Sequence, residues 1–319
     1  MLQPPPEPVH VAYSIWDLSD SYNAIAGVAL ISLLENTKSH VVIHLLYDEK
    51  LHTDFPAYTE NYKKYLCIQE RYNCEVLFHH VDAPEWLHSL PSVRYYSFGT
   101  FLRLFLPEIV PWLDKIIYLD CDICVDTDIV DLWNFDLKGK SLGVDTLKFN
   151  AGVIIMDLQK IRKEHELAKE TLTFLNNHPR TKLLDQDALQ HVFKDDVVFF
   201  NRLYNITTDF HDTYAEKRGI FHYTWTKPWK VWRGGECPEM TFWKYYSKTP
   251  WANFPYFVKA LAECSDLSLQ HANTSAERLL YYPLKYRIHY LLKFIFSFTR
   301  IHLRELKVKT LDCIRKHET

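Results

Sequence analysis

Residues Lys115-Ile116-Ile117-Tyr118-Leu119-Asp120-Cys121-Asp122 decide the fold, because an apolar run leads directly into two carboxylates. A run of this length predicts a buried strand. Alternate residues of an extended chain share a face, so Asp120 and Asp122 are expected to lie close together at the end of the strand. Carboxylate oxygens are hard ligands that suit Mg²⁺ or Mn²⁺. The stretch therefore predicts a strand that ends in a divalent-metal site.

Strands and helices alternate on both sides of this stretch. The alternation predicts an α/β domain on a Rossmann-like sheet, whose ligands bind beyond the carboxyl ends of the strands. The loop after Tyr13 is therefore a candidate binding site. Strands are expected over residues 9–13, 41–47, 74–78, 115–119, 142–144, 197–200 and within 150–157, and helices over residues 24–34, 53–69, 95–107, 158–176 and from 185 onward.

The composition excludes some classes of protein. With 319 residues, 47% of them apolar, the chain can bury a sizeable core. A formal charge of -3 argues against a surface built for nucleic acid, and no apolar run approaches the roughly 20 residues that span a bilayer. Seven irregularly spaced cysteines favour a reducing cytosol over a disulfide framework. Cys121 and Cys124 would point to opposite faces of an extended chain, which disfavours a zinc pair.

Seven short segments together resemble glycosyltransferase family 8, a retaining family that includes bacterial lipopolysaccharide galactosyl- and glucosyltransferases and glycogenin. Each segment alone is weak evidence, but all seven occur in the family's order between residues 9 and 229. They are the opening at residues 13–22, Gly99-Thr100-Phe101-Leu102-Arg103-Leu104, Ile117-Tyr118-Leu119-Asp120-Cys121-Asp122, Leu132-Trp133-Asn134, Phe149-Asn150-Ala151-Gly152-Val153, Asp185-Gln186-Asp187, and His222-Tyr223 with Lys227-Pro228-Trp229.

The resemblance implies a GT-A type nucleotide-diphospho-sugar transferase fold with a mixed sheet and a helical carboxyl-terminal annex. It also implies that Asp120, Asp122 and His222 bind Mn²⁺, with Mg²⁺ as the alternative ion, and that Lys227 contacts the donor diphosphate. The chemistry agrees, because a neutral imidazole is a natural metal ligand and an ammonium group is a strong point charge for phosphate. Without the nearby Lys-Pro-Trp segment, His222 would read as an ordinary histidine of an aromatic stretch.

By the same resemblance, Tyr13, Ser14, Asp17 and Tyr22 would receive uridine and ribose, with Asp17 preferred to Asp20 as the family's acid. An aromatic ring can stack on the base while hydroxyl and carboxylate groups bond its imide and the sugar. The remaining donor-binding residues implied by the resemblance are Arg103, Cys121, Asn150, Ala151, Gly152, Asp185 and Gln186.

These remaining residues would surround the donor sugar. Gly152 would permit close backbone approach. Asp185 and Gln186 are the implied catalytic residues: Asp185 would bond a sugar hydroxyl, and Gln186 would lie under the anomeric carbon. Two structural alternatives stay open, because Arg103 could form an ordinary salt bridge and Asp185 could simply begin a helix, where Asp is favoured.

Two departures from the family concern the acceptor and the diphosphate. Only four residues separate Asp145 from Asn150, where relatives usually carry a long excursion over the acceptor. His222 and Lys227 are five positions apart, one fewer than in many members, and the usual glycine between them is replaced. The acceptor therefore stays undefined.

The sequence also allows three other interpretations. The two carboxylates could belong to an acidic turn, since Asp126 and Asp128 follow closely. A haloacid-dehalogenase-type phosphatase also places Asp-x-Asp after an apolar strand, but usually near the amino terminus and with Thr or Val where Cys124 stands here. A catalytically inactive nucleotide-sugar or glycan-binding protein would keep the fold without turnover.

Residues 1–8 are proline-rich and are expected to form a disordered lead-in rather than a signal peptide. Residues 9–250 are the expected catalytic domain, and residues 251–319 the helical, basic carboxyl-terminal region. Within that region, residues 281–316 interleave apolar and cationic side chains, which suits either an anionic membrane surface or an apolar stripe packed on the catalytic domain.

The combined prediction is a Mn²⁺-dependent retaining hexosyltransferase. It would move galactose or glucose from UDP-galactose or UDP-glucose to a glycan or glycolipid acceptor. The expected location is the cytoplasm, with peripheral attachment to the inner face of the plasma membrane, and no nucleic acid partner.

Overall fold

The computed structural model of the chain describes residues 7–16, 21–48, 56–82, 84–89, 98–145, 149–210, 218–224, 227–229 and 237–252. Residues 1–227 and 236–252 form one compact unit, and this unit contains all described residues except 228 and 229. The predicted lead-in lies mostly, and the predicted carboxyl-terminal region almost entirely, outside the described residues. The predicted domain boundaries therefore stay predictions.

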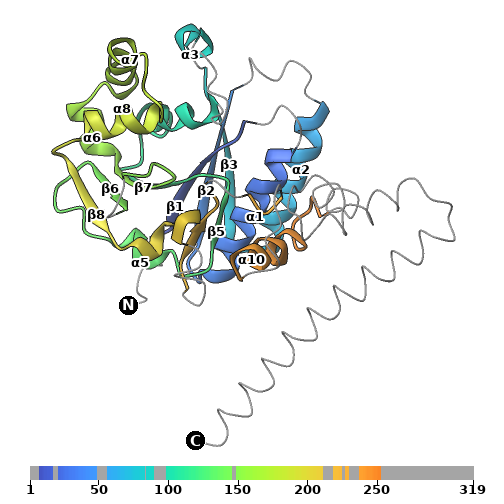
Figure 1. Cartoon of the computed structure of the whole chain (residues 1–319). Coiled ribbons are helices and arrows are strands. Elements are labelled where there is room, and N and C mark those ends of the chain that lie inside the picture. The colour runs from blue at the N-terminus through green and yellow to red at the C-terminus, as the bar shows by residue number, and fades with distance from the viewer. Residues whose placement is uncertain are drawn as a thin grey trace, which may run out of the picture. The chain divides into compact units, whose positions relative to one another are not determined.

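A mixed sheet of seven strands forms the centre of this unit (Figure 1). Six strands point the same way, and β7 runs antiparallel to its neighbours β4 and β6. In the order β3-β2-β1-β4-β7-β6-β8, the strands are β3 Cys74–His80, β2 Val41–Tyr47, β1 Val9–Ser14, β4 Lys115–Leu119, β7 Val153–Asp157, β6 Leu142–Asp145 and β8 Val197–Phe200. The predicted mixed α/β fold class is confirmed.

A second sheet of three short strands carries part of the site. Its order is β5-β10-β9, with β5 at Ile123–Val125, β10 at Ile220–His222 and β9 at Ile206–Thr207. The β10 strand pairs antiparallel with β5, so that His222 lies opposite Ile123. Because β5 follows Asp122 directly, this pairing brings His222 to the end of the predicted Asp-x-Asp segment.

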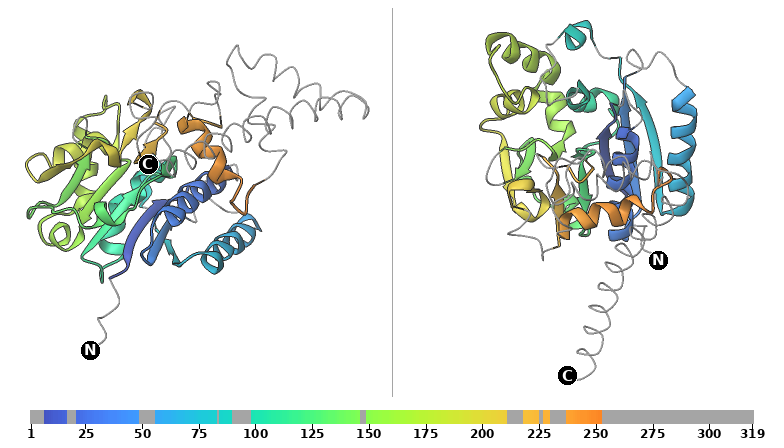
Figure 2. Two further views of the ribbon diagram at one scale, coloured as in Figure 1. Left: turned by 90° about the horizontal axis from the view of Figure 1, so that it is seen from below. Right: turned by 45° about the vertical axis from the view of Figure 1, so that its right-hand side comes forward.

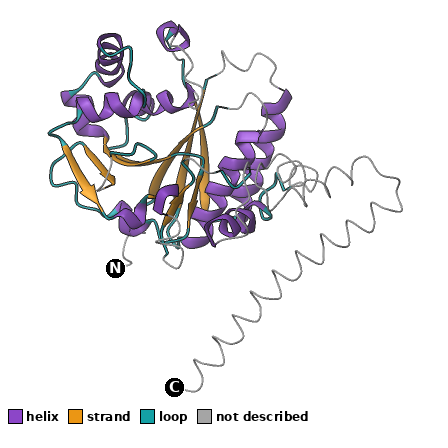
Figure 3. Cartoon of the chain, in the orientation of Figure 1, coloured by secondary structure: helices purple, strands orange, loops and turns teal. Residues whose placement is uncertain are grey.

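Helices flank the strands on both sides (Figure 3). The helices α1 and α2 lie toward the β1–β3 end and α6 to α8 toward the β6–β8 end (Figure 2). Nearly every residue of α1 from Asn23 to Leu34 is buried, as expected of a helix that is apolar all round. The helices are α1 Ser21–Asn36, α2 Pro56–Arg71, α3 Glu85–Ser89, η2 Phe98–Phe105, α4 Leu106–Ile109, α5 Val130–Trp133, α6 Leu158–Glu164, α7 Leu167–Asn177, α8 Asp185–Val192, η3 Arg202–Tyr204, η4 Thr208–Phe210 and α10 Cys237–Tyr246.

Two predicted helices are wrong in detail. Of the helix expected over residues 95–107, the described part from residue 98 is a 3₁₀ helix, η2, followed by the single α-turn of α4. The helix expected over residues 158–176 is broken between α6 and α7, because His165 is extended. Glu170 stabilises the start of α7. Its carboxylate accepts a hydrogen bond from the Glu166 backbone N–H and lies 3.1 Å from His165 Nδ1. Within the described residues, no helix is both long and apolar enough to cross a membrane.

Three histidines form a hydrogen-bonded row across β1, β2 and β3. His10 Nδ1 lies 3.0 Å from His44 Nε2, and His44 Nδ1 lies 2.9 Å from His79 Nε2. The central His44 is fully buried. Its burial, followed by the proximity of His79 and His10, lowers the pKa of His44 to about 3. The folded protein therefore keeps His44 neutral at pH values where an unfolded chain would protonate it.

We expect this row to make stability depend on pH. The pKa of His44 in the folded protein lies below its unfolded value near 6.5, so neutral His44 contributes fully to stability above pH 6.5. This contribution is lost as the pH falls toward 3. By pH 5, His44 alone should lower the free energy of unfolding by about 2 kcal/mol. Chemical denaturation at pH 8 and pH 5 measures the difference. His44→Leu should reduce it, whereas His40→Leu, at an exposed position, should not. An equal pH dependence in the wild type and His44→Leu would contradict this account.

Candidate metal centre and active site

Asp120, Asp122 and His222 meet where β4, β5 and β10 converge. His222 Nε2 lies 3.7 Å from Asp120 Oδ2 and 3.3 Å from Asp122 Oδ1. One ligand atom from each residue lies within 4.8 Å of the others. Two carboxylates and an imidazole form a donor set that suits a hard or borderline divalent cation. The three residues predicted from the sequence as metal ligands therefore form a possible metal site.

Gly152 makes this convergence possible. The Asp120 backbone N–H donates to the Gly152 carbonyl at 2.8 Å, which places the turn before β7 against the metal ligands. A Cβ on Gly152 would lie 2.1 Å from His222 Cε1 and 2.8 Å from Asp120 Oδ2. No side chain fits at this position unless the ligands move, while the predicted approach of the Gly152 backbone to a donor sugar stays a prediction.

Lys227 reaches the same group from the loop after β10. Its ammonium donates to Asp122 Oδ2 and to the Tyr223 carbonyl. Burial raises the pKa of Asp122, but the charges and hydrogen bonds of Lys227 and His222 outweigh it and hold that pKa below its usual range. Asp122 is therefore anionic and faces a cation on one side and the imidazole on the other.

Arg103 is buried, and its guanidinium joins several segments of the site. Its side chain is 2% exposed, with Nη2 3.1 Å from Asp120 Oδ1 and Nε 3.2 Å from Asp185 Oδ2. Nη1 donates to the Ala151 carbonyl, and the guanidinium lies over the Tyr118 ring. Arg103 thus forms salt bridges, as the structural alternative expects. The predicted contact of Arg103 with the sugar donor stays a prediction.

Asn150, Ala151 and Gln186 meet on the other side of Gly152. Gln186 Oε1 accepts from the Ala151 backbone N–H at 3.1 Å and lies 3.4 Å from Asn150 Nδ2. Asp185 and Gln186 begin α8, as the helix-start alternative expects, directly after Leu184, which has an unusual positive φ of 47°. Burial, opposed by Arg103, raises the pKa of the Asp185 carboxyl to about 6.

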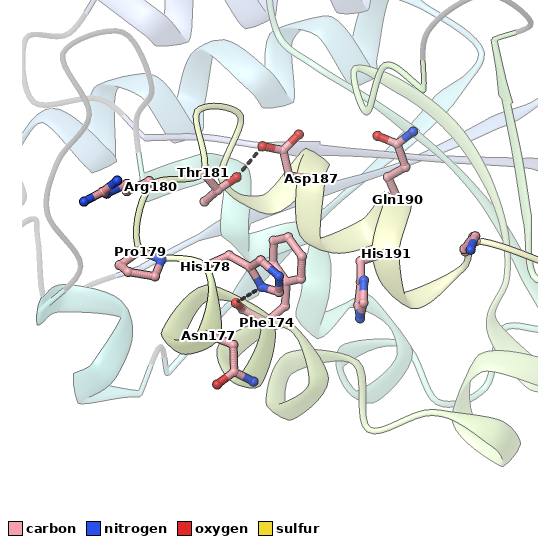
Figure 4. Close-up of a pocket in the computed structure, with 10 residues that line it drawn as sticks. Phe174, Asn177, His178, Pro179, Arg180, Thr181, Asp187, Gln190 and His191 are labelled. Atoms are coloured by element: carbon pink, nitrogen blue, oxygen red, sulfur yellow. Dashed lines mark hydrogen bonds between the residues drawn. The ribbon is translucent and has the colours of Figure 1, made fainter.

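Asp187, the third residue of the predicted segment, turns away from this group. Its carboxylate accepts from Thr181 Oγ1 and from the Leu183 backbone N–H at 3.0 Å, which closes the loop before α8. It lines a separate cavity of about 790 Å³. Figure 4 shows that this cavity is lined by the end of α7, the loop before α8 and α8 itself. Asp187 is therefore a structural residue of this loop.

Two of the expected nucleotide-binding residues, Tyr13 and Ser14, lie at the end of β1. Cys121 Sγ donates to the Ser14 carbonyl at 3.2 Å, which joins β1 to the Asp-x-Asp segment. Tyr13 is fully buried and its ring offers no open face, so its stacking on a base stays a prediction. Its hydroxyl is buried with no hydrogen-bond partner among the described residues. Asp17 and Asp20 lie outside the described residues, and Tyr22 is partly buried in the first turn of α1.

Sequence reasoning missed Asn205. This fully buried residue lies between η3 and β9, and its amide contacts both His222 and Asn150. A single Asn before a two-residue strand has no periodicity or spacing that could mark it. Tyr118, whose hydroxyl donates to Asp120 Oδ1 at 3.1 Å, appeared in the sequence only as an apolar strand residue.

The mixed sheet and the segments around it form a fold of the GT-A type. A crystal structure of galactosyltransferase LgtC in complex with donor and acceptor sugar analogues superposes with a TM-score of 0.61 at 22% identity, covering 78% of this chain and 99% of LgtC. The glycosyltransferase GlyE of Streptococcus pneumoniae superposes with a TM-score of 0.57 at 22% identity, covering 75% of this chain and 60% of GlyE.

The chain belongs to glycosyltransferase family 8, whose family model matches residues 14–233. It is 24% identical over 279 residues to an Escherichia coli lipopolysaccharide 1,2-glucosyltransferase, covering 76% of this chain and 79% of that protein. It is 27% identical over 222 residues to the glycosyltransferase GlyF of Streptococcus pneumoniae, covering 63% of this chain. The chain spans about half of GlyF, 53%, and 64% of a Haemophilus influenzae relative.

The contact of Gly152 with the ligands predicts that Gly152→Ala weakens divalent-metal binding. The added Cβ must displace His222 or Asp120, and disturbed ligand orientation typically costs roughly 10- to 100-fold in metal affinity. Titration of Mn²⁺ monitored by its electron paramagnetic resonance signal measures the change. Gly139→Ala is the control: this glycine has a φ of 72° and open space around its Cβ position, so stability should fall while metal affinity stays unchanged. Wild-type affinity in Gly152→Ala would contradict the prediction.

Proposed function

We propose that the chain is a retaining hexosyltransferase that takes galactose or glucose from a UDP-sugar, with Mn²⁺, or alternatively Mg²⁺, as the metal. The single observation that carries the proposal is the convergence of Asp120, Asp122 and His222 beside Lys227 on one side and Gln186 on the other. Family membership supports transfer of a sugar, and the names of the Escherichia coli glucosyltransferase and of LgtC support glucose and galactose as the candidate sugars.

Asp120, Asp122 and His222 would hold the metal, which when bound neutralises the charge that develops on a departing diphosphate. Lys227 adds a positive charge at the same point. Its ammonium contacts Asp122 in this structure, and we expect it to turn to a phosphate oxygen when the donor binds, because a Lys side chain is flexible. Both features would stabilise the leaving group more than the intact donor, and such a difference is what accelerates a reaction.

Gln186 and Asp185 are the residues proposed to face the donor sugar. The Ala151 N–H and Asn150 hold the Gln186 amide, and Arg103 holds the Asp185 carboxylate. Fixed positions of this kind favour catalysis, because the reacting atoms need little reorganisation. Gln186 is proposed to lie under the anomeric carbon and Asp185 to bond a sugar hydroxyl.

The acceptor is proposed to be a glycan or a lipid-linked sugar. An inactive nucleotide-sugar-binding protein is the alternative, favoured only by the short connection of four residues between Asp145 and Asn150. Asp120, Asp122, His222 and Lys227 together argue for turnover. A protein that only binds the nucleotide sugar needs no charged groups that stabilise a leaving group.

Release of UDP from a panel of UDP-sugars tests the proposal. We expect metal-dependent release that falls roughly 100-fold or more in Asp122→Asn, because metal stabilisation of the leaving group contributes several kcal/mol. Asp131→Asn, an exposed carboxylate in the same acidic segment, is the control and should keep wild-type activity. Metal-dependent UDP binding without release from any donor, even with candidate acceptors present, would favour the inactive binder, and a complete lack of UDP binding would refute the assignment.

A second experiment concerns residues 281–316, which lie outside the described residues. We propose that this basic, apolar segment attaches the protein peripherally to the inner face of the membrane. The full chain should bind anionic phospholipid vesicles at low salt and leave them at high salt, because surface attraction is screened within about 10 Å at 0.1 M. Neutral vesicles are the control. Failure to sediment with anionic vesicles at low salt would refute attachment.

A further inference from the structure

Asn205 stands between the metal centre and the sugar-facing residues. It has no exposed surface, and its backbone N–H donates to the Arg202 carbonyl at 2.8 Å. Arg202 is itself fixed by a buried ion pair, with Nη2 3.0 Å from Asp145 Oδ2. The backbone of Asn205 is therefore held in place. Both ends of its side-chain amide form hydrogen bonds: one atom lies 3.0 Å from His222 Nδ1 and the other 2.9 Å from Asn150 Oδ1.

The direction of these hydrogen bonds follows from a backbone group whose role is fixed. The Gly152 N–H can only donate, and it lies 3.0 Å from Asn150 Oδ1, so that atom is the carbonyl oxygen of Asn150. The Asn205 atom facing the same oxygen must then be the amide nitrogen. Hence Asn205 turns its own oxygen toward His222, and only a protonated Nδ1 on His222 can donate to it.

This tautomer directs the ring toward the metal site. Because Nδ1 is committed to this hydrogen bond, Nε2, the nitrogen that faces Asp120 and Asp122, is the one left to bind a divalent cation. A histidine ligand commonly donates its other N–H to an oxygen that fixes the orientation of the ring.

The same network reaches Gln186. The Ala151 N–H identifies Gln186 Oε1 as an oxygen, and Asn150 Nδ2 lies 3.4 Å from it. The row His222, Asn205, Asn150 and Gln186 is therefore one directional chain, anchored by the backbone amides of two consecutive residues, Ala151 and Gly152.

We propose that Asn205 is a positioning residue for this site. It fixes the Nδ1–H tautomer of His222, and through Asn150 it sets the orientation of the Gln186 amide. The role in sugar transfer rests on the proposed function, whereas the role in His222 tautomer and metal binding does not.

Nitrogen-15 NMR of the histidine-labelled, metal-free full chain at pH 8 reads the tautomer directly, with the His222 resonances assigned by their loss in His222→Gln. We expect a protonated Nδ1 on His222 in the wild type and a shift toward the form protonated on Nε2 alone in Asn205→Ala. Mn²⁺ binding measured by electron paramagnetic resonance should weaken roughly 10- to 100-fold in Asn205→Ala.

Asn205→Asp separates the two halves of the role. A carboxylate still accepts from His222 Nδ1–H but cannot donate to Asn150, so we expect the wild-type tautomer and near-wild-type Mn²⁺ affinity, with lower kcat for UDP release. Asn201→Ala is the matched control, because this nearby exposed Asn caps η3 through the Leu203 N–H and does not belong to the network.

Three results would overturn the proposal: an Nε2–H tautomer in the wild type, wild-type tautomer and Mn²⁺ affinity in Asn205→Ala, or an equal loss of Mn²⁺ affinity in Asn201→Ala. The first needs no variant, so the test survives if Asn205→Ala does not fold. If wild-type protein releases no UDP from any donor, the proposed function fails, while the NMR and Mn²⁺ measurements still decide the role of Asn205 at His222.

Discussion

The buried guanidinium of Arg103 is the interaction on which the geometry of the site depends. It joins three segments that are distant in sequence: Asp120 at the end of β4, Ala151 before β7, and Asp185 at the start of α8. An Arg fork can serve all three because its N–H groups are planar and fixed relative to one another, which a Lys could not reproduce. Removing it would leave buried carboxylates without their counter-charge, a change that typically costs several kcal/mol.

The direction of β7 determines which segments Arg103 can contact. Because β7 runs antiparallel to β4, its first residue, Val153, lies beside Leu119, the last residue of β4. The turn that precedes β7 therefore meets the Asp-x-Asp segment at the same edge of the sheet. Pairing of β10 with β5 then adds His222 to that edge. The sheet order thus explains why residues spread over more than one hundred positions form a single site.

Features that depend on local sequence patterns were predicted well, whereas features that depend on tertiary contacts were not. The strands β2, β4 and β8 were predicted with the bounds that the structure has, because apolar runs report burial directly. The break at His165 was not visible, since one extended residue barely disturbs a helical period. Asp120 and Asp122 could be inferred from spacing alone, but His222 and Lys227 only through resemblance to a family. Asn205 acts entirely through tertiary contacts, and no local pattern encodes those.

The ion pair between Lys227 and Asp122 implies an order of events. Among the described residues, the carboxylates of Asp120, Asp122 and Asp185 face two permanent cations, Arg103 and Lys227, which leaves a small negative excess. On the proposed function, a divalent cation held by Asp120, Asp122 and His222 would reverse the sign of the local potential before a polyanionic donor could bind well. Lys227 would then exchange one anionic partner for another, which would keep its charge paired throughout. The proposed site would therefore act as an electrostatic gate that favours binding of the cation before the nucleotide.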